Sequence, residues 1–234
     1  MVLEEYRARV QPYVARLARP FHGWPPNRVS SLAFGLCAAA ALLAALVRWT
    51  TPYLFLGVAV LIFLGGLFDV LDGEVARATG RASRRGDLLD HVLDRYADVL
   101  ILLGIAVSGF ANPVLALLAL VSLLLTSYMG TQAQAVGLGR MYAGLLSRAD
   151  RLVILSLAAF LEFDWSLPWP WAPTAPWERF TLGPIGFTVI DVALLYFVIA
   201  GQITAIGRAR SAYRALPEAS GAAAAPPPPG AHGP

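Results

Sequence analysis

The sequence predicts an all-α membrane protein: a bundle of six transmembrane helices with an amphipathic helix at the N-terminus. Three observations lead to this fold class. The 234 residues are 57% hydrophobic and only 14% charged, whereas about a quarter of the residues in soluble domains are charged. Apolar stretches recur along the chain, and about twenty apolar residues suffice to cross a bilayer. Polar or proline-rich segments separate these stretches, as expected for the loops between spans.

The first element expected is an amphipathic helix over residues 2–20. Its apolar side carries Val10, Val14 and Leu17, and arginines surround that side. A helix with this pattern lies in the plane of the membrane interface, with its apolar face toward lipid and its arginines toward the headgroups. We therefore expect a juxtamembrane helix before the first span.

Six segments have the length and apolarity of membrane spans. They cover residues 29–47, 53–71, 87–107, 113–136, 148–163 and 185–206. The segment 164–180 is rich in tryptophan and proline, which is typical of an interfacial loop. We expect residues 1–214 to form one membrane domain. The alanine- and proline-rich tail, residues 215–234, is expected to be disordered.

The arginines predict the orientation of this bundle. With six spans, most of them fall on the side that holds the N-terminus, the segment 73–86, the loop 137–147 and the C-terminus, whereas the opposite loops hold only Arg48 and Arg179. By the positive-inside rule the first side is cytoplasmic, so we expect a multi-pass protein of the cell (plasma) membrane. The arginines follow membrane boundaries and form no single stripe, so no nucleic-acid partner is expected.

Residues 69–94 carry the densest group of acids. Asp69 and Asp72 form one pair and Asp90 and Asp94 another, spaced three and four residues apart, so each pair shares one face of a helix. Four neighbouring carboxylates repel one another unless a cation neutralises them. Hard oxygen ligands suit magnesium or manganese. The sequence therefore predicts a divalent-metal site at the cytoplasmic ends of the second and third spans.

This segment resembles the signature of the CDP-alcohol phosphotransferase (CDP-alcohol phosphatidyltransferase) family. The eight matching positions are Asp69, Asp72, Gly73, Ala76, Arg77, Gly86, Asp90 and Asp94. The N-terminal helix, the six spans and Pro26 followed by Asn27 at the start of the first span also fit the family. The resemblance covers the whole chain except the tail.

The resemblance implies an integral-membrane phospholipid synthase. Such an enzyme transfers a lipid-phosphate group from a CDP-linked lipid to the hydroxyl of a polyol and releases CMP. Asp69, Asp72 and Asp90 would hold a first metal ion, and Asp69, Asp90 and Asp94 a second, both Mg²⁺ or Mn²⁺. Two ions can clamp the attacking and leaving oxygens. Asp94 would also be the general base that takes the proton of the acceptor hydroxyl.

The resemblance also assigns a nucleotide site. Asp72, Gly73, Ala76, Arg77 and Gly86 would line the CDP-binding site. Glycines let a nucleotide approach the backbone closely, and an arginine offers a planar fork to phosphate. Homodimers are usual in the family, and the resemblance is the sole reason to expect one here.

The acceptor pocket is expected at the cytoplasmic ends of the fourth and fifth spans. Arg140, Arg148 and Arg151 cluster there, with Tyr128 and Gln132 nearby. An arginine cluster beside the metals suits a phosphorylated alcohol, because a second phosphate needs its own cationic partner. The alternative is that these arginines only obey the positive-inside rule.

The fourth span departs from one branch of the family. In the inositol-phosphate branch it carries Ser-Tyr-x-Lys-Ala-Arg-Ala-Glu, whereas Gly130, Gln132 and Gln134 replace the lysine, arginine and glutamate here. This version resembles archaeal members near the archaetidylinositol and archaetidylglycerol phosphate synthases. Inositol phosphate and glycerol phosphate are therefore both acceptor candidates, and the donor would be CDP-archaeol or CDP-diacylglycerol.

Two other functions also place acids in a membrane. An intramembrane prenyltransferase uses magnesium and paired aspartates, but it needs more spans and gives no reason for Gly73, Arg77 and Gly86 at these spacings. In a non-enzymatic cation transporter the acids would line a path across the membrane, whereas these acids gather at one face. Two further acids lie outside the signature. Asp98 is expected to pair with a neighbouring span. For Asp191, a role in the cavity and a structural hydrogen bond remain open.

Overall fold

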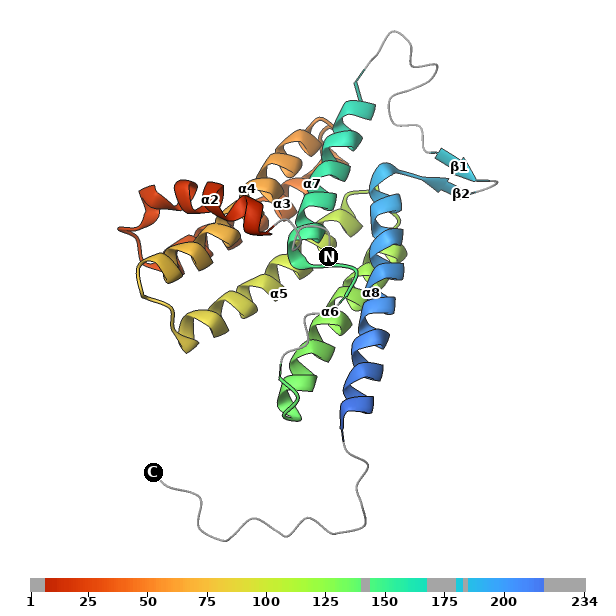
Figure 1. Ribbon diagram of the computed structural model, residues 1–234. Helices are drawn as coiled ribbons and strands as arrows, with labels where there is room; N and C mark the ends of the chain where they lie inside the picture. The colour runs from red at the N-terminus through yellow and green to blue at the C-terminus, as the bar shows by residue number, and fades with distance from the viewer. Residues whose placement is uncertain (1–6, 140–143, 168–179, 183–184, 217–234) are drawn as a thin grey trace, which may run out of the picture.

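The computed structural model describes residues 7–139, 144–167, 180–182 and 185–216, and this part of the chain is predominantly helical (Figure 1). The helices are α2 (Arg7–Ala18), α3 (Pro26–Leu46), α4 (Leu54–Ala78), α5 (Arg84–Val107), α6 (Pro113–Ala135), α7 (Arg148–Trp165) and α8 (Val189–Ala215). Two short 3-10 helices, Arg19–Phe21 and Val47–Trp49, follow α2 and α3. The predicted helical class is confirmed in this main feature.

Four of the described helices are long and apolar enough to cross a membrane. They are α3 together with the 3-10 turn after it, α4, α6 and α8. Helices α5 and α7 form where the third and fifth spans were predicted, but both carry several charged side chains: those of α5 lie before residue 99, and those of α7 lie near its two ends. Length and composition therefore support four spans, and the six-span bundle stays a prediction.

Two helix ends differ from the predicted span boundaries. The second span was expected to end at residue 71, but α4 continues to Ala78. The sixth was expected to begin at residue 185, but α8 begins at Val189, where Thr188 and Asp191 form a capping box. The predicted bounds followed apolar composition, which indicates the residues that suit lipid. The ends of a helix depend instead on its backbone hydrogen bonds and caps, so the two sets of bounds differ.

A β-hairpin was also missed by the sequence-based prediction. Strands β1 (Phe180–Leu182) and β2 (Ile185–Phe187) pair antiparallel, with Thr181 opposite Gly186. Strand β2 occupies the start of the predicted sixth span, and three-residue strands give too short a pattern to detect. Most of the predicted interfacial loop (residues 168–179) and nearly all of the predicted tail (residues 217–234) lie outside the described residues.

Helix α3 lies at the centre of the packing that positions the acids, because it contacts both α4 and α5. Small residues permit the close approach. A Cβ placed on Gly65 of α4 would lie 2.5 Å from the sulfur of Cys37, and a Cβ on Gly104 of α5 would overlap the carbonyl oxygen of Ala41. Membrane helices commonly approach one another through such small residues. Substituting either glycine would therefore push α4 or α5 away from α3.

Helix α2 crosses the C-terminal half of α4 (Figure 1). It forms inside the segment predicted as an interfacial helix, and it buries Val14 and Ala18 against Leu71 and Val75. Val10, which lies on the predicted apolar side, remains exposed. The buried face of α2 thus packs on protein, and its location at a membrane surface stays a prediction.

Candidate active site

Three signature acids lie close together between α4 and α5. Asp69 and Asp72 come from α4 and Asp90 comes from α5, and each offers a carboxylate oxygen within 4.8 Å of the other two. Asp72 is only 6% exposed, and its Oδ2 is buried without a hydrogen-bond partner. An unsatisfied buried oxygen that belongs to a cluster of three carboxylates fits the donor set of a hard divalent cation.

The fourth signature acid, Asp94, lies beside this cluster and is joined to it by an arginine. Nη1 of Arg148 lies 2.8 Å from Oδ1 of Asp94 and also contacts Oδ1 of Asp69. The guanidinium therefore supplies positive charge to one carboxylate from each of the two helices. The structure thus brings all four acids and Arg148 to one place.

The start of α7 places Arg148 at the acids. Ser147 caps the helix: its hydroxyl accepts a hydrogen bond from the Asp150 amide at 3.2 Å, and Asp150 Oδ2 accepts one from the Ser147 amide at 3.0 Å. This reciprocal capping box fixes the first turn of the helix. Arg148 is the first residue of that turn, and its side chain is largely buried.

A buried ion pair lies next to Asp94. Arg151 Nη1 donates to Asp98 Oδ2 at 2.9 Å, and both side chains are buried. Arg95 lies 3.6 Å from Asp98 and 3.8 Å from Asp94. The predicted pairing of Asp98 with a neighbouring helix is confirmed. An acceptor-binding role for Arg151 would require the acceptor to reach this buried guanidinium.

The residues expected to bind CDP follow the acids along α4. A Cβ on Gly73 would lie 3.3 Å from Nη1 of Arg77, so the arginine folds back over the glycine. Arg77 Nη2 donates to Glu74 Oε2 at 3.0 Å, and the Arg77 side chain is 54% exposed. Ala76, half-buried, immediately precedes the arginine. This arrangement presents a partly exposed guanidinium within a turn and a half of Asp72.

The remaining glycine of the signature lies at the start of α5. Ser83 caps this helix by accepting a hydrogen bond from the Gly86 amide at 3.1 Å. A Cβ on Gly86 would lie 3.3 Å from the Ser83 hydroxyl and 3.4 Å from Oδ1 of Asn27, in the first turn of α3. Gly86 therefore keeps space between the ends of two helices, close to the acids of α5.

The other predicted acceptor residues make no described hydrogen bond to the acids. Tyr128 is exposed on α6, and Gln132 lines a cavity of about 220 Å³ between the C-terminal ends of α6 and α8. In the described part of the chain neither residue hydrogen bonds to Arg148 or to the four acids. Arg140 lies outside the described residues.

Sequence reasoning missed Glu74, which contacts Arg77 of the predicted CDP site, and Gln11, which contacts Glu74. Glu74 is 9% exposed and accepts hydrogen bonds from Arg77 and from Gln11 of α2, the latter at 2.6 Å. The only signal for Glu74 is its place immediately after Gly73. Gln11 gives no signal, because it lies 63 residues away in the sequence.

The opposite end of the bundle holds buried acids with a different environment. Asp191, 1% exposed, accepts hydrogen bonds from the amides of Asn112 at 2.6 Å and Thr188 at 3.0 Å. Glu162 accepts from the amides of Val189 at 3.1 Å and Ile190 at 3.4 Å. Of the two alternatives for Asp191, the structural hydrogen bond is therefore the one observed.

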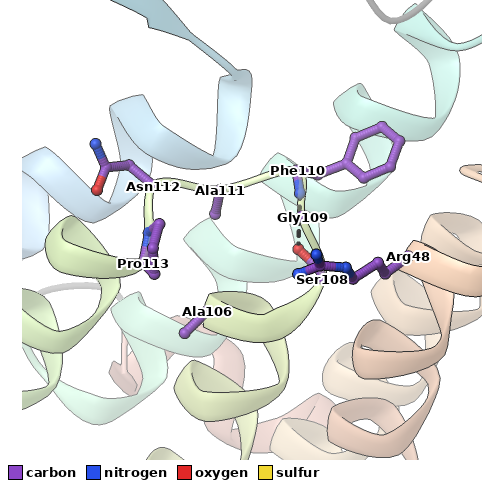
Figure 2. Close-up of a pocket in the computed structure, with 8 residues that line it drawn as sticks. All are labelled: Arg48, Ala106, Ser108, Gly109, Phe110, Ala111, Asn112 and Pro113. Carbon is purple, nitrogen blue, oxygen red and sulfur yellow. Dashed lines mark hydrogen bonds between the residues drawn. The ribbon is translucent and has the colours of Figure 1, made fainter.

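This end also contains the larger of the two described cavities, of about 520 Å³, in the turn between α5 and α6. Figure 2 shows the Arg48 side chain running past Ser108 and Gly109 at its edge. The Ser108 hydroxyl donates to the Ile105 carbonyl at 2.7 Å. No carboxylate lines this cavity, and α5 carries its acids toward the other end.

Comparison with known proteins decides the family. Residues 25–177, which include every position of the signature, match the CDP-alcohol phosphatidyltransferase family. The chain belongs to this family. The archaetidylinositol phosphate synthase of Pyrococcus horikoshii is 29% identical over 163 residues, covering 69% of this chain and 84% of the relative. The phosphatidylinositol phosphate synthase of Mycobacteroides abscessus is 33% identical over 180 residues, covering 74% of this chain and 78% of the relative.

Solved structures agree with this assignment. The phosphatidylinositol phosphate synthase of Mycobacterium tuberculosis with CDP-DAG bound superposes with a TM-score of 0.63 at 25% identity, covering 86% of this chain and 93% of that chain. The same enzyme in complex with manganese and citrate gives a TM-score of 0.65, covering 86% and 88%. The chain is therefore a transferase of substituted phosphate groups and a membrane phospholipid synthase, and the predicted family and enzyme class are confirmed.

Proposed function

We propose that this protein transfers a lipid-phosphate group from a CDP-linked lipid to the hydroxyl of a polyol phosphate and releases CMP. The observation that carries the proposal is the convergence of Asp69, Asp72 and Asp90, with oxygens within 4.8 Å of one another, inside the segment that matches the family. Family membership also removes the reasons for considering a prenyltransferase or a cation transporter.

The acids suit two divalent cations, Mg²⁺ or Mn²⁺. Asp69, Asp72 and Asp90 would hold one ion. Asp94 together with Asp69 and Asp90 would hold a second, which requires Arg148 to move away from the Asp69 and Asp94 oxygens that it contacts. When bound, such ions neutralise the pyrophosphate and stabilise charge on the attacking and leaving oxygens. The unsatisfied Oδ2 of Asp72 supports this assignment. The Mycobacterium tuberculosis enzyme has been solved in complex with manganese and citrate, which supports divalent-metal binding by this protein.

Asp94 is suited to act as the general base. Its carboxylate takes the proton of the acceptor hydroxyl, the hydroxyl oxygen bonds to the phosphorus attached to the lipid, and the bond from that phosphorus to the CMP oxygen breaks. Removal of the proton in the transition state accelerates such reactions about 10²–10⁴-fold. Arg148, 2.8 Å from Asp94, would place a cation where the phosphate of the acceptor must lie.

The nucleotide would lie along the turn of α4 that follows Asp72. Arg77 offers a partly exposed guanidinium to the pyrophosphate, and an arginine can bind phosphate through two parallel hydrogen bonds. Gly73, Ala76 and Gly86 carry little or no side chain, so they leave room for the nucleotide beside the backbone.

Inositol phosphate is the acceptor favoured by the relatives, because they are named as synthases of archaetidylinositol phosphate and phosphatidylinositol phosphate. Glycerol phosphate remains the competing acceptor, because Gly130, Gln132 and Gln134 replace charged residues of the inositol-phosphate branch. The donor would be CDP-archaeol or CDP-diacylglycerol. CDP-DAG is the ligand named for the Mycobacterium tuberculosis structure.

The proposed enzyme is a six-span homodimer of the plasma membrane with its acids on the cytoplasmic side and α2 in the interface. The distribution of the arginines supports the orientation. Protease accessibility of the 79–83 turn in inside-out and right-side-out vesicles tests the orientation. Light scattering of the purified protein in detergent tests the dimer.

The decisive experiment measures CMP release by purified protein. CDP-diacylglycerol and CDP-archaeol are each tested against inositol phosphate, glycerol phosphate, serine and free inositol, with and without EDTA, and the lipid product is identified by mass. We expect metal-dependent CMP release with a polyol phosphate and none without an acceptor. The absence of metal-dependent CMP release with every pair would refute the proposed function.

A further inference from the structure

The turn of α4 that carries Arg77 is connected to the N-terminal helix through Glu74. Oε2 of Glu74 accepts a hydrogen bond from Arg77 Nη2 at 3.0 Å and one from Gln11 Nε2 at 2.6 Å. Glu74 is 9% exposed. A buried carboxylate is costly unless it is paired and hydrogen-bonded, so these two donors account for the position of the glutamate.

Gln11 reaches Glu74 from a packed face of α2. Gln11, Val14 and Ala18 follow one another at spacings of three and four residues, so they share one face of the helix. Val14 and Ala18 are buried against Leu71 and Val75 of α4. The side chain of Gln11 is therefore presented from a fixed contact between the two helices.

Arg77 depends on this contact for its geometry. Its side chain is 54% exposed, and a long exposed arginine loses considerable rotamer freedom when it binds a ligand. Glu74 holds one end of the guanidinium, and Gly73 leaves the space into which it folds, since a Cβ there would lie 3.3 Å from Nη1. The guanidinium has five N–H donors, so most of them stay available for phosphate.

We infer that Glu74, held by Gln11, is a positioning residue that orients Arg77 toward the pyrophosphate of the CDP-linked donor. This inference rests on the proposed role of Arg77 in CDP binding. Helix α2 thereby contributes to the donor site through the Gln11–Glu74 hydrogen bond. Glu74 acts through the arginine, because a carboxylate would itself repel phosphate.

A double-mutant cycle tests whether Glu74 acts through Arg77. The isosteric variant Glu74→Gln removes the charge that holds the guanidinium, and we expect the KM for the CDP-lipid to rise about tenfold, the usual size of one hydrogen bond to a charged group. The KM for the acceptor should change less than about twofold. In the Arg77→Ala background the same substitution should change the donor KM less than about twofold, because the two residues act as a unit.

Gln11→Leu tests the contribution of α2. We expect a smaller rise in donor KM, about threefold, because the Glu74–Arg77 pair remains. Arg16→Ala is the matched control, since Arg16 is an exposed residue of the same helix, and it should leave both KM values unchanged. Thermal unfolding of each variant in detergent identifies any that fold poorly.

Three outcomes would overturn the inference. One is an undiminished effect of Glu74→Gln in the Arg77→Ala background, and another is an equal rise of both KM values. The third is a donor KM that Glu74→Gln leaves unchanged while Arg77→Ala raises it. An unchanged donor KM in Arg77→Ala would instead refute the proposed role of Arg77. Equilibrium binding of CDP to the same variants measures the contact without turnover, so it separates this inference from a failure of the proposed reaction.

Discussion

Both ends of the helix bundle contain acids with little exposure, but the groups that their carboxylates face differ. At one end Asp69, Asp72 and Asp90 point oxygens at one another within 4.8 Å. At the other end Asp191 and Glu162 point at backbone amides near the first turn of α8. The first arrangement leaves charge to be neutralised by a cation, whereas the second uses each carboxylate to satisfy donors of the fold.

This difference shows that burial alone does not identify a functional acid. Acids inside spans are good candidates for function because they are costly there. Asp191 is as buried as any acid of the candidate site, yet its partners are amides that would otherwise be unsatisfied at a helix start. The direction in which the oxygens point separates the two classes, and the sequence does not contain that direction.

The largest expected effect is that of Asp94→Asn. An amide cannot take the proton of the acceptor hydroxyl, so we expect CMP release to fall about 10³-fold while the protein remains folded. Asp87→Asn is the matched control, because Asp87 is an exposed aspartate of the same helix. Steady-state CMP release and thermal unfolding measure the two quantities. Wild-type activity in Asp94→Asn would remove Asp94 as the base.

The Asp98–Arg151 pair is intermediate between the two ends, because the carboxylate faces an arginine side chain instead of other acids or backbone amides. Arg151→Met removes the 2.9 Å partner of the buried Asp98 carboxylate and leaves Arg95 at 3.6 Å, and breaking a buried pair costs up to roughly 3–5 kcal/mol. We expect a marked fall in the melting temperature that the double variant Asp98→Leu/Arg151→Met largely reverses. Should the double variant fold well but show a raised KM for the acceptor alone, Arg151 would belong to the acceptor site.

Divalent metal should stabilise the folded protein by binding at the end where the acids face one another. A ligand that binds the folded state at a hundred times its Kd adds about 2.7 kcal/mol, so Mg²⁺ or Mn²⁺ should raise the melting temperature of EDTA-treated protein. Asp72→Asn should reduce this rise, and Asp191→Asn should retain it. An equal response in both variants would contradict the assignment of the metal to the cluster.

The smallest effect is expected for Asp191→Asn. The substitution turns an amide group toward one of two backbone donors, Asn112 or Thr188, which costs about 1–3 kcal/mol for an unsatisfied buried group. The melting temperature should fall, and CMP release per folded molecule should persist at a temperature below the transition. Loss of CMP release in folded protein would show that Asp191 takes part in the chemistry.

The sequence predicted those parts of the site that depend on local spacing. Residues such as Asp69 and Asp72 share a helix face whatever the fold does, and the helical character follows from apolar stretches. The sequence could not place Arg148 between Asp69 and Asp94, because that contact depends on how α7 packs against α4 and α5. It also could not find Gln11, whose contact with Glu74 spans two helices.

The continuation of α4 to Ala78 has a consequence for substrate supply. At 1.5 Å per residue Asp69 lies ~22 Å along the helix from Leu54, with ~14 Å of helix still to follow. In a span that starts near Leu54, the acids then lie within or at the edge of a hydrocarbon layer ~30 Å thick. A lipid-linked donor can reach them by lateral diffusion, with its tails still among other tails. Turnover should therefore depend on the mole fraction of the donor in the leaflet, while the water-soluble acceptor arrives from the opposite direction.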